Sequence, residues 1–122
     1  MNFVYQSFSN KVYFGDGQVN NISDIARELN GTRLFVVAGS RHQPIIQALK
    51  NSFGDRNICH FTNIVQHVPR LIVDEALELA HHHGSDLLIA IGGGSAIGLA
   101  KAVALQTRLR IVAVPSPIPV PR

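Results

Sequence analysis

The sequence has 122 residues, of which 46% are hydrophobic and 16% charged, and its formal net charge is +3. This length fits one domain, or part of a larger one, and the composition is that of a soluble globular chain. The basic residues are scattered, with no run longer than two, which argues against nucleic acid or a membrane surface as a partner. A single cysteine, Cys59, excludes a disulfide framework and a cysteine-based metal site.

The opening residues, MNFVYQSFSNK, lack the basic segment and apolar segment of a secretory signal. No apolar stretch of the sequence approaches the length that would cross a membrane. We therefore expect a cytoplasmic protein without a membrane partner.

Two short stretches rich in aromatic and β-branched residues open the chain, at 3–7 and 11–15, and the FSN between them predicts a β-hairpin. A helix is predicted over 19–29, with Gly31 as its stop. The run RLFVVA at 33–38, which is continuously apolar after Arg33, predicts a strand that is buried on both faces.

Helices and strands alternate through the rest of the chain. In order, we predict a helix over 43–53 with Pro44 in its first turn, a weaker strand over 57–62, a helix over 69–83 with Gly84 as its C-cap, a strand over 86–91, a helix over 95–105 and a strand over 110–114. Such alternation predicts a parallel sheet with crossover helices. The predicted fold class is therefore α/β: an open parallel sheet with helices on both faces, preceded by the hairpin, in one domain over 1–115.

The strand over 86–91 runs into Gly92, Gly93 and Gly94, followed by Ser95 and a helix. Ligands of open parallel sheets bind beyond the carboxyl ends of the strands. Glycine lets a ligand approach the backbone, and a helix N-terminus offers unpaired N–H groups that suit a phosphate. Ser95 can cap this helix or donate its hydroxyl to a phosphate oxygen, and Gly98 would let the helix pack closely. The alternative is a tight strand-to-helix turn without a ligand.

Two common phosphate-binding motifs do not fit this loop. Gly92 and Gly94 begin a G-x-G-x-x-G pattern, but Ile97 stands where the third glycine belongs. That fingerprint also belongs to the first strand–helix turn of a fold, whereas this loop follows a late strand. The G-x-x-x-x-G-K-[ST] pattern is absent, which excludes a P-loop NTPase.

The stretch GGGSAIGLAKAVAL, followed by IVAVP, resembles the dinucleotide-binding part of the iron-containing alcohol dehydrogenase family. The opening MNFVYQSFSNKVYFGDG and the QHVP at 66–69 are similar to that family as well. Within it, the sequence resembles the maleylacetate reductase branch, which has Gly at the position of Gly98 where other branches carry Asp. The resemblance covers residues 1–115 and implies NAD(H) or NADP(H) as the cofactor, with its pyrophosphate over Gly93, Gly94 and Ser95.

The resemblance also implies where the rest of the dinucleotide lies. In the family, the turn after the first long parallel strand approaches the adenosine ribose, and that turn is Gly39-Ser40-Arg41 here. Many members have Asp at the position of Gly39, where it would bond the ribose hydroxyls and repel a 2′-phosphate. With Gly39 and Arg41 we expect NADPH to be tolerated alongside NADH. His67 and Lys101 are further candidates for cofactor contact, and each is alternatively a solvated side chain.

The end of the chain departs from the family pattern. Members continue with a P-T-T-x-x-G-S-E-like loop and a helical domain that carries the metal or proton-transfer residues, whereas here Pro115 precedes SPIPVPR, a Pro-rich tail over 116–122. The resemblance therefore implies an NAD(P)H-dependent oxidoreductase of the maleylacetate reductase type (maleylacetate to 3-oxoadipate, in aromatic-compound degradation), truncated and inactive alone. A remnant of an iron-type alcohol dehydrogenase and a stand-alone, non-catalytic nucleotide-binding module stay open as alternatives, as does a homodimer.

The run His81-His82-His83 near the end of a predicted helix invites a metal-site interpretation. Consecutive helical side chains fan out about 100° apart, so the three rings cannot easily share one ion. We expect them to interact with the negative end of the helix dipole before Gly84. No metal ligand and no catalytic residue is predicted in this chain.

Overall fold

The computed structural model describes residues 2–7, 10–15 and 22–115. The elements are β1 (Asn2–Ser7), β2 (Asn10–Gly15), α1 (Ile22–Glu28), β3 (Leu34–Ala38), η2 (Ser40–His42), α2 (Gln43–Phe53), η3 (Asp55–Asn57), β4 (Ile58–Phe61), α3 (Arg70–His83), β5 (Leu87–Gly92), α4 (Gly94–Thr107) and β6 (Ile111–Pro115). Each predicted helix and strand is confirmed, with ends that differ by a few residues. The start of the helix predicted over 19–29 and the tail 116–122 lie outside the described residues.

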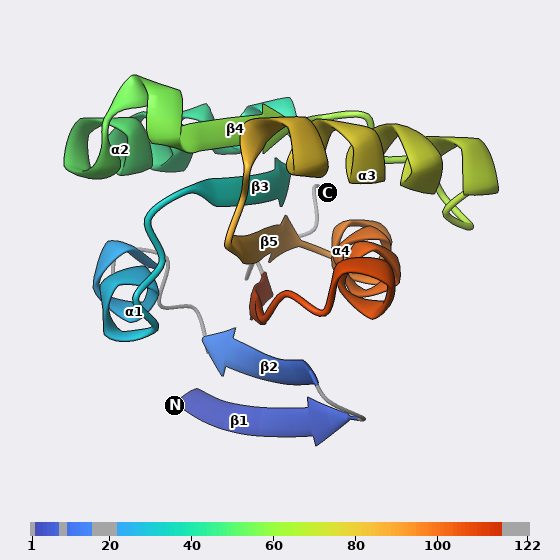
Figure 1. Ribbon diagram of the computed structural model, residues 1–122, viewed down its shortest axis with the longest axis horizontal. Coiled ribbons are helices and arrows are strands. Elements are labelled where there is room, and N and C mark those ends of the chain that lie inside the picture. The colour runs from blue at the N-terminus through green and yellow to red at the C-terminus, as the bar shows by residue number, and fades with distance from the viewer. Residues whose placement is uncertain (1, 8–9, 16–21, 116–122) are drawn as a thin grey trace, which may run out of the picture.

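The strands form one six-stranded sheet in the order β1-β2-β6-β5-β3-β4. β1 pairs antiparallel with β2 as the predicted hairpin, and the other four pairings are parallel. Figure 1 shows α1 and α2 on one side of the stacked strands and α3 and α4 on the other. The prediction of an open parallel sheet with helices on both faces is therefore confirmed. No helix in the described part of the chain is both long and apolar enough to span a bilayer.

Successive residues of each central strand belong to different layers of the core. In β3, Phe35 and Val37 pack with α3 and α4, whereas Leu34, Val36 and Ala38 pack with α1 and α2. All five are fully buried. A strand covered on both faces has no need for polar positions, which explains its continuous apolar sequence.

The connections after β3 and β5 leave the sheet in opposite directions. The chain passes from β3 through α2 to β4 at one edge, and from β5 through α4 to β6 on the other side. β3 and β5 are direct neighbours, paired from Leu34↔Leu87 to Ala38↔Ile91. Neighbouring parallel strands whose connections diverge leave a crevice at their carboxyl ends, which is the usual ligand site of such sheets. The residues that follow Ala38 and Ile91 border this crevice.

A polar network ties the chain together at the amino ends of the same strands. The Asp86 carboxylate accepts hydrogen bonds from the Thr32 amide (3.0 Å), the Thr32 hydroxyl (2.6 Å) and the Arg33 amide (3.1 Å). The Arg110 guanidinium donates to the Leu29 carbonyl at 2.5 Å. These bonds join the loops before β3, β5 and β6, so side chains of the protein itself occupy the amino ends of these strands.

The end of α1 differs from the prediction in the role of its glycine. Asn30, not Gly31, adopts the left-handed conformation, with φ of 62°, and the Gly31 amide donates to the Ala26 carbonyl at 2.9 Å. A β-carbon on Gly31 would lie 2.8 Å from Leu87 Cδ2 and 3.1 Å from Leu34 Cδ2. Asn30 thus supplies the turn conformation, and Gly31 supplies the room for α1 to meet the sheet.

The end of α3 agrees with its prediction. Gly84 has φ of 72°, and the Ser85 amide donates to the Ala80 carbonyl at 3.1 Å, which is the hydrogen bond of a Schellman cap. The two ring nitrogens of His83 lie 2.7 Å from Ser85 Oγ and 3.0 Å from the Arg56 carbonyl oxygen. This histidine therefore has a structural role at the helix end.

Candidate functional site

The three loop glycines have different structural causes. Gly92 ends β5 with φ of 132°, a conformation that side chains rarely adopt. Gly93 has φ of −96° and ψ of −160°, which any residue can adopt, and Gly94 is the first residue of α4. A β-carbon on Gly93 or Gly94 would meet no atom within 4 Å. Of the three loop glycines, therefore, the backbone conformation requires glycine only at Gly92.

This difference separates the two interpretations of the loop. A tight strand-to-helix turn without a ligand explains Gly92 and leaves Gly93 and Gly94 unexplained. Both of these residues are exposed at the carboxyl edge of the sheet, where their missing side chains leave the backbone open. Close approach of a ligand to the backbone explains Gly93 and Gly94 as well.

The N-terminus of α4 faces this open space with unpaired donors. The first hydrogen bond within the helix runs from the Ile97 amide to the Gly93 carbonyl at 3.1 Å, so the amides of Gly94, Ser95 and Ala96 have no acceptor inside the helix. No acidic residue lies in its first turn. The positive end of the helix dipole is therefore free to hold an anion.

The helix start bears on one of the two roles predicted for Ser95, that of a helix cap. α4 begins at Gly94, one residue before the predicted start, and Gly93 is its N-cap without a side-chain hydrogen bond. Ser95 lies inside the first turn, so the predicted capping role is wrong. Because Gly93 has the extended conformation of an N-cap, the helix begins at Gly94, one residue before the start that we predicted from Ser95.

The turn after β3 forms the opposite border of the crevice. Gly39 follows the strand with φ of −70° and ψ of 166°, and the His42 amide donates to its carbonyl at 3.1 Å to close the 3₁₀ turn η2. Ser40 and Arg41 are exposed. A β-carbon on Gly39 would meet nothing within 4 Å, so the turn has room for a side chain that it lacks.

The most unusual residue at these strand ends was not among the predicted site residues. His42 is 8% exposed and is the single buried polar residue among those whose side chains the structure describes. A β-carbon on Gly92 would lie 3.9 Å from His42 Nε2. Burial, then the Arg41 guanidinium and the His60 ring, lower the pKa of His42 from its ordinary 6.5. Its position, at a helix start that follows a buried strand and precedes Pro44, was the signal that could have found it.

The remaining predicted residues lie along one flank of α4. A β-carbon on Gly98 would contact Val68 Cγ2 at 3.5 Å, so this glycine sits beneath the loop that precedes α3. His67, next to Val68, is exposed and has φ of 66°. Lys101 is exposed and lies about 10 Å along the helix axis from Gly94, at 1.5 Å per residue.

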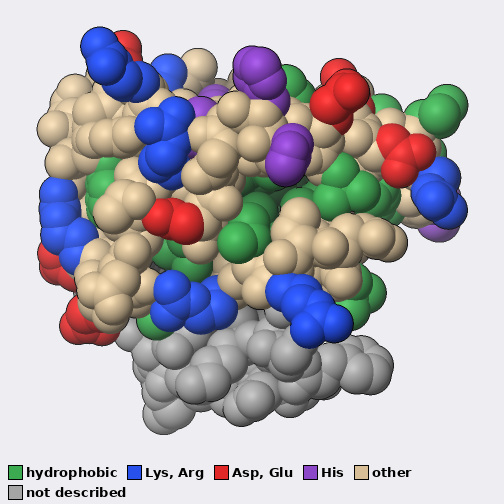
Figure 2. Space-filling view, viewed as in Figure 1, with side chains coloured by type: hydrophobic (Ala, Val, Ile, Leu, Met, Phe, Trp, Pro, Cys, Tyr) green, Lys and Arg blue, Asp and Glu red, His purple; other side chains and the backbone are tan. Residues whose placement is uncertain are grey.

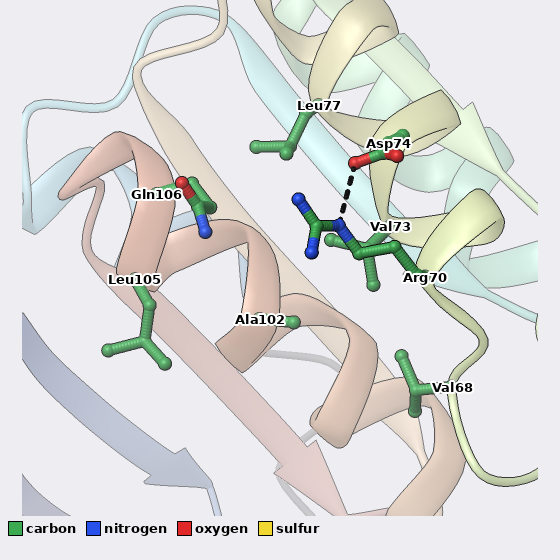
Figure 3. Close-up of a pocket in the computed structure, with 8 residues that line it drawn as sticks. All are labelled: Val68, Arg70, Val73, Asp74, Leu77, Ala102, Leu105 and Gln106. Atoms are coloured by element: carbon green, nitrogen blue, oxygen red, sulfur yellow. Dashed lines mark hydrogen bonds and ion pairs between the residues drawn. The ribbon is translucent and has the colours of Figure 1, made fainter.

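A shallow groove between α3 and α4 is a separate feature. Leu77, Val73 and Leu105 give it apolar walls, and the Arg70–Asp74 ion pair, with an N–O distance of 3.5 Å, lies at its side (Figure 3). None of the glycine-loop residues lines it.

Charge is distributed without a dominant sign. On the face shown in Figure 2, Lys and Arg side chains are interspersed with Asp and Glu, in agreement with the scattered charges of the sequence. Among the described residues, no three His, Cys, Asp or Glu side chains gather as ligands of a metal ion would.

An open parallel sheet with a glycine loop and a helix N-terminus at its switch point defines a doubly wound, Rossmann-like α/β domain. The chain belongs to the iron-containing alcohol dehydrogenase family, whose sequence model matches residues 9–119. The resemblance seen in the sequence is thereby confirmed.

Individual relatives point to one branch of this family. The chain is similar to the maleylacetate reductase of Sphingobium indicum, with 36% identity over 116 residues that cover 95% of this chain and 33% of the relative. Among solved structures it is similar to a putative alcohol dehydrogenase from Ralstonia eutropha JMP134 (TM-score 0.72, 31% identity, 93% of this chain and 32% of that one). It is also similar to maleylacetate reductase from Agrobacterium tumefaciens (TM-score 0.72, 28% identity, the same coverage). The chain spans about a third of the length of the curated relatives it matches.

Proposed function

We propose that this chain is the dinucleotide-binding part of an NAD(P)H-dependent oxidoreductase of the maleylacetate reductase type. The observation that carries the proposal is the open backbone of Gly93 and Gly94 beside the unpaired amides of α4, at the switch point of the sheet. Similarity to maleylacetate reductases over 95% of the chain supports the choice of branch.

Each border of the crevice has its own part in this proposal. The pyrophosphate lies over Gly93, Gly94 and Ser95, where amides and dipole stabilise its negative charge. The adenosine ribose lies toward the turn 39–41, and Gly92 provides the sharp strand end that places the loop beneath the phosphates. Gly98, His67 and Lys101 form the outer flank of the same site.

The nicotinamide ring supplies the hydride when the cofactor is bound. The residues of this chain bind and orient it: the α4 amides fix the pyrophosphate, and the turn after β3 fixes the adenosine end. Reduction of maleylacetate to 3-oxoadipate also needs a substrate and a proton donor held beside the ring with water excluded. We propose that this chain alone binds the cofactor and does not turn over.

The proposal is tested by a fluorescence titration of NADH with the purified chain. The protein has no Trp, so the emission of the cofactor is measured without interference. Gly94→Asp places a carboxylate where the pyrophosphate is proposed, while an acidic residue in the first turn of a helix favours folding. The control is Gln106→Glu, which adds the same charge to an exposed position at the far end of α4.

We expect saturable binding by the wild type and by Gln106→Glu, and loss of binding by Gly94→Asp at a thermal stability no lower than that of the wild type. A folded wild-type chain that binds neither NADH nor NADPH overturns the proposal. Equal binding by Gly94→Asp would remove the glycine loop from the site.

A further inference from the structure

His42 combines burial with an orientation toward the candidate site. Its ring lies beside the carboxyl end of β5, with Nε2 3.9 Å from the β-carbon position of Gly92. The residue is 8% exposed. No hydrogen bond joins its ring to any residue that the structure describes, although its backbone amide bonds Gly39.

Two other histidines of the chain show how unusual this is. His60 is only partly buried, yet its Nε2 lies 2.8 Å from the Ala38 carbonyl oxygen. His83, also partly buried, uses both ring nitrogens. Buried polar groups are nearly always hydrogen-bonded, because an unsatisfied one loses its hydrogen bonds to water without replacement. The more buried ring is thus the one that needs a partner from outside the described residues.

The electrostatic surroundings of His42 define what that partner can be. Burial, together with Arg41 on its own turn and His60 from β4, lowers the pKa of the ring, so the ring is neutral at pH 7. A neutral imidazole has one N–H donor. A cation in the crevice would face Arg41 beside the ring, whereas an anion there is favoured by Arg41 and by the dipole of α4.

We propose that His42 is a direct dinucleotide contact, whose Nε2–H donates a hydrogen bond to a pyrophosphate oxygen held over the glycine loop. The inference rests on the proposed function, because the pyrophosphate is the anion placed there. A hydrogen bond to a charged phosphate oxygen is shorter and stronger than one between neutral groups. The same contact satisfies the N–H donor of the buried ring and adds a side-chain donor to the backbone amides of α4.

Two substitutions separate the hydrogen bond from the shape of the ring. His42→Phe keeps a ring of similar size and removes the donor. His42→Gln keeps a side-chain N–H close to the position of Nε2. Because a hydrogen bond to a charged group contributes about 1.5–3 kcal/mol, we expect His42→Phe to weaken NADH binding by about tenfold or more and His42→Gln by less than about threefold.

The measurement is a fluorescence titration of NADH, with competition by ADP and by adenosine, and thermal unfolding as a check on folding. His42→Phe is expected to weaken ADP and leave adenosine unchanged, since adenosine has no phosphate. Wild-type affinity in His42→Phe, an equal loss in both variants, or an equal loss for adenosine overturns the His42 contact and leaves the proposed function standing. A folded wild-type chain that does not bind NADH overturns both.

Discussion

His42 and Gly92 face each other across the ends of β3 and β5, with His42 Nε2 3.9 Å from the position that a β-carbon on Gly92 would occupy. The two residues come from segments that are distant in the chain and adjacent in the sheet. A side chain at Gly92 would therefore enter the space beside the imidazole. Glycine is required at position 92 by the positive φ of the backbone, and its missing side chain leaves space beside the His42 ring.

The first prediction concerns the cost of that conformation. Gly92→Ala is expected to lower the free energy of unfolding by about 1–3 kcal/mol, because φ of 132° is strained for any side chain. Gly93→Ala is the matched control and is expected to change stability by less than about 0.5 kcal/mol. Urea unfolding followed by circular dichroism measures both. Equal costs for the two variants would contradict the different causes assigned to these glycines.

The turn after β3 leads to a prediction about cofactor choice. Gly39→Asp has room for its side chain and places a carboxylate beside the proposed ribose site, where it would repel a 2′-phosphate. We expect NADPH to bind this variant at least about tenfold more weakly, relative to NADH, than it binds the wild type. Gly39→Asn, which has the same shape without the charge, is the control. A wild type that binds NADPH about a hundredfold more weakly than NADH would instead remove the proposed tolerance.

A third prediction concerns the amino ends of the strands. Asp86→Ala removes the acceptor of two backbone amides and of the Thr32 hydroxyl, so we expect it to destabilise the fold by about 1–3 kcal/mol. Its NADH affinity should stay that of the wild type, because the network lies at the opposite ends of the strands. Thermal unfolding tests the expected loss of stability, and the NADH titration of the same sample tests the unchanged affinity. A weaker NADH affinity in a fully folded Asp86→Ala variant would show that the two ends of the strands are coupled.

The lowered pKa of His42 predicts how stability depends on pH. The unfolded chain protonates this residue near pH 6.5, whereas the folded chain resists protonation, so the unfolded state binds more protons below that pH. The stabilising contribution of neutral His42 to the free energy of unfolding is therefore complete above pH 6.5. It is lost as the pH falls toward the lowered pKa of the folded state. We expect His42→Phe to flatten this part of the stability profile. A wild-type slope that survives the substitution would assign it to other groups.

The layers of the fold could be predicted from the sequence because their cause is local. The run 34–38 has no polar position, and a strand of that kind must be covered on both faces. The start of α2, with Pro44 in its first turn, and the cap at Gly84 follow from the conformations those residues favour. The spatial order of the strands could not be predicted in this way, because it depends on which face each crossover takes.

The candidate site divides in the same manner. The glycine loop could be recognised from the sequence, because several glycines between a strand and a helix have few causes other than close approach of a ligand. The role of Gly31 depends on Leu87, which lies far along the chain and meets it only in the folded sheet. The burial of His42 likewise depends on the neighbouring β5 strand, so a sequence pattern alone presents it as an ordinary loop histidine.

The Asp86 network and the glycine loop lie at opposite ends of the same strands. Substitutions at distant sites without shared partners usually have additive effects on stability. A change of ligand preference at one end can therefore accumulate without consuming the hydrogen bonds that keep the other end folded. The sheet thus separates the glycine-loop end, on which selection for new chemistry can act, from the Asp86 end, which has to be preserved. This separation lets one scaffold diverge into enzymes of different specificity.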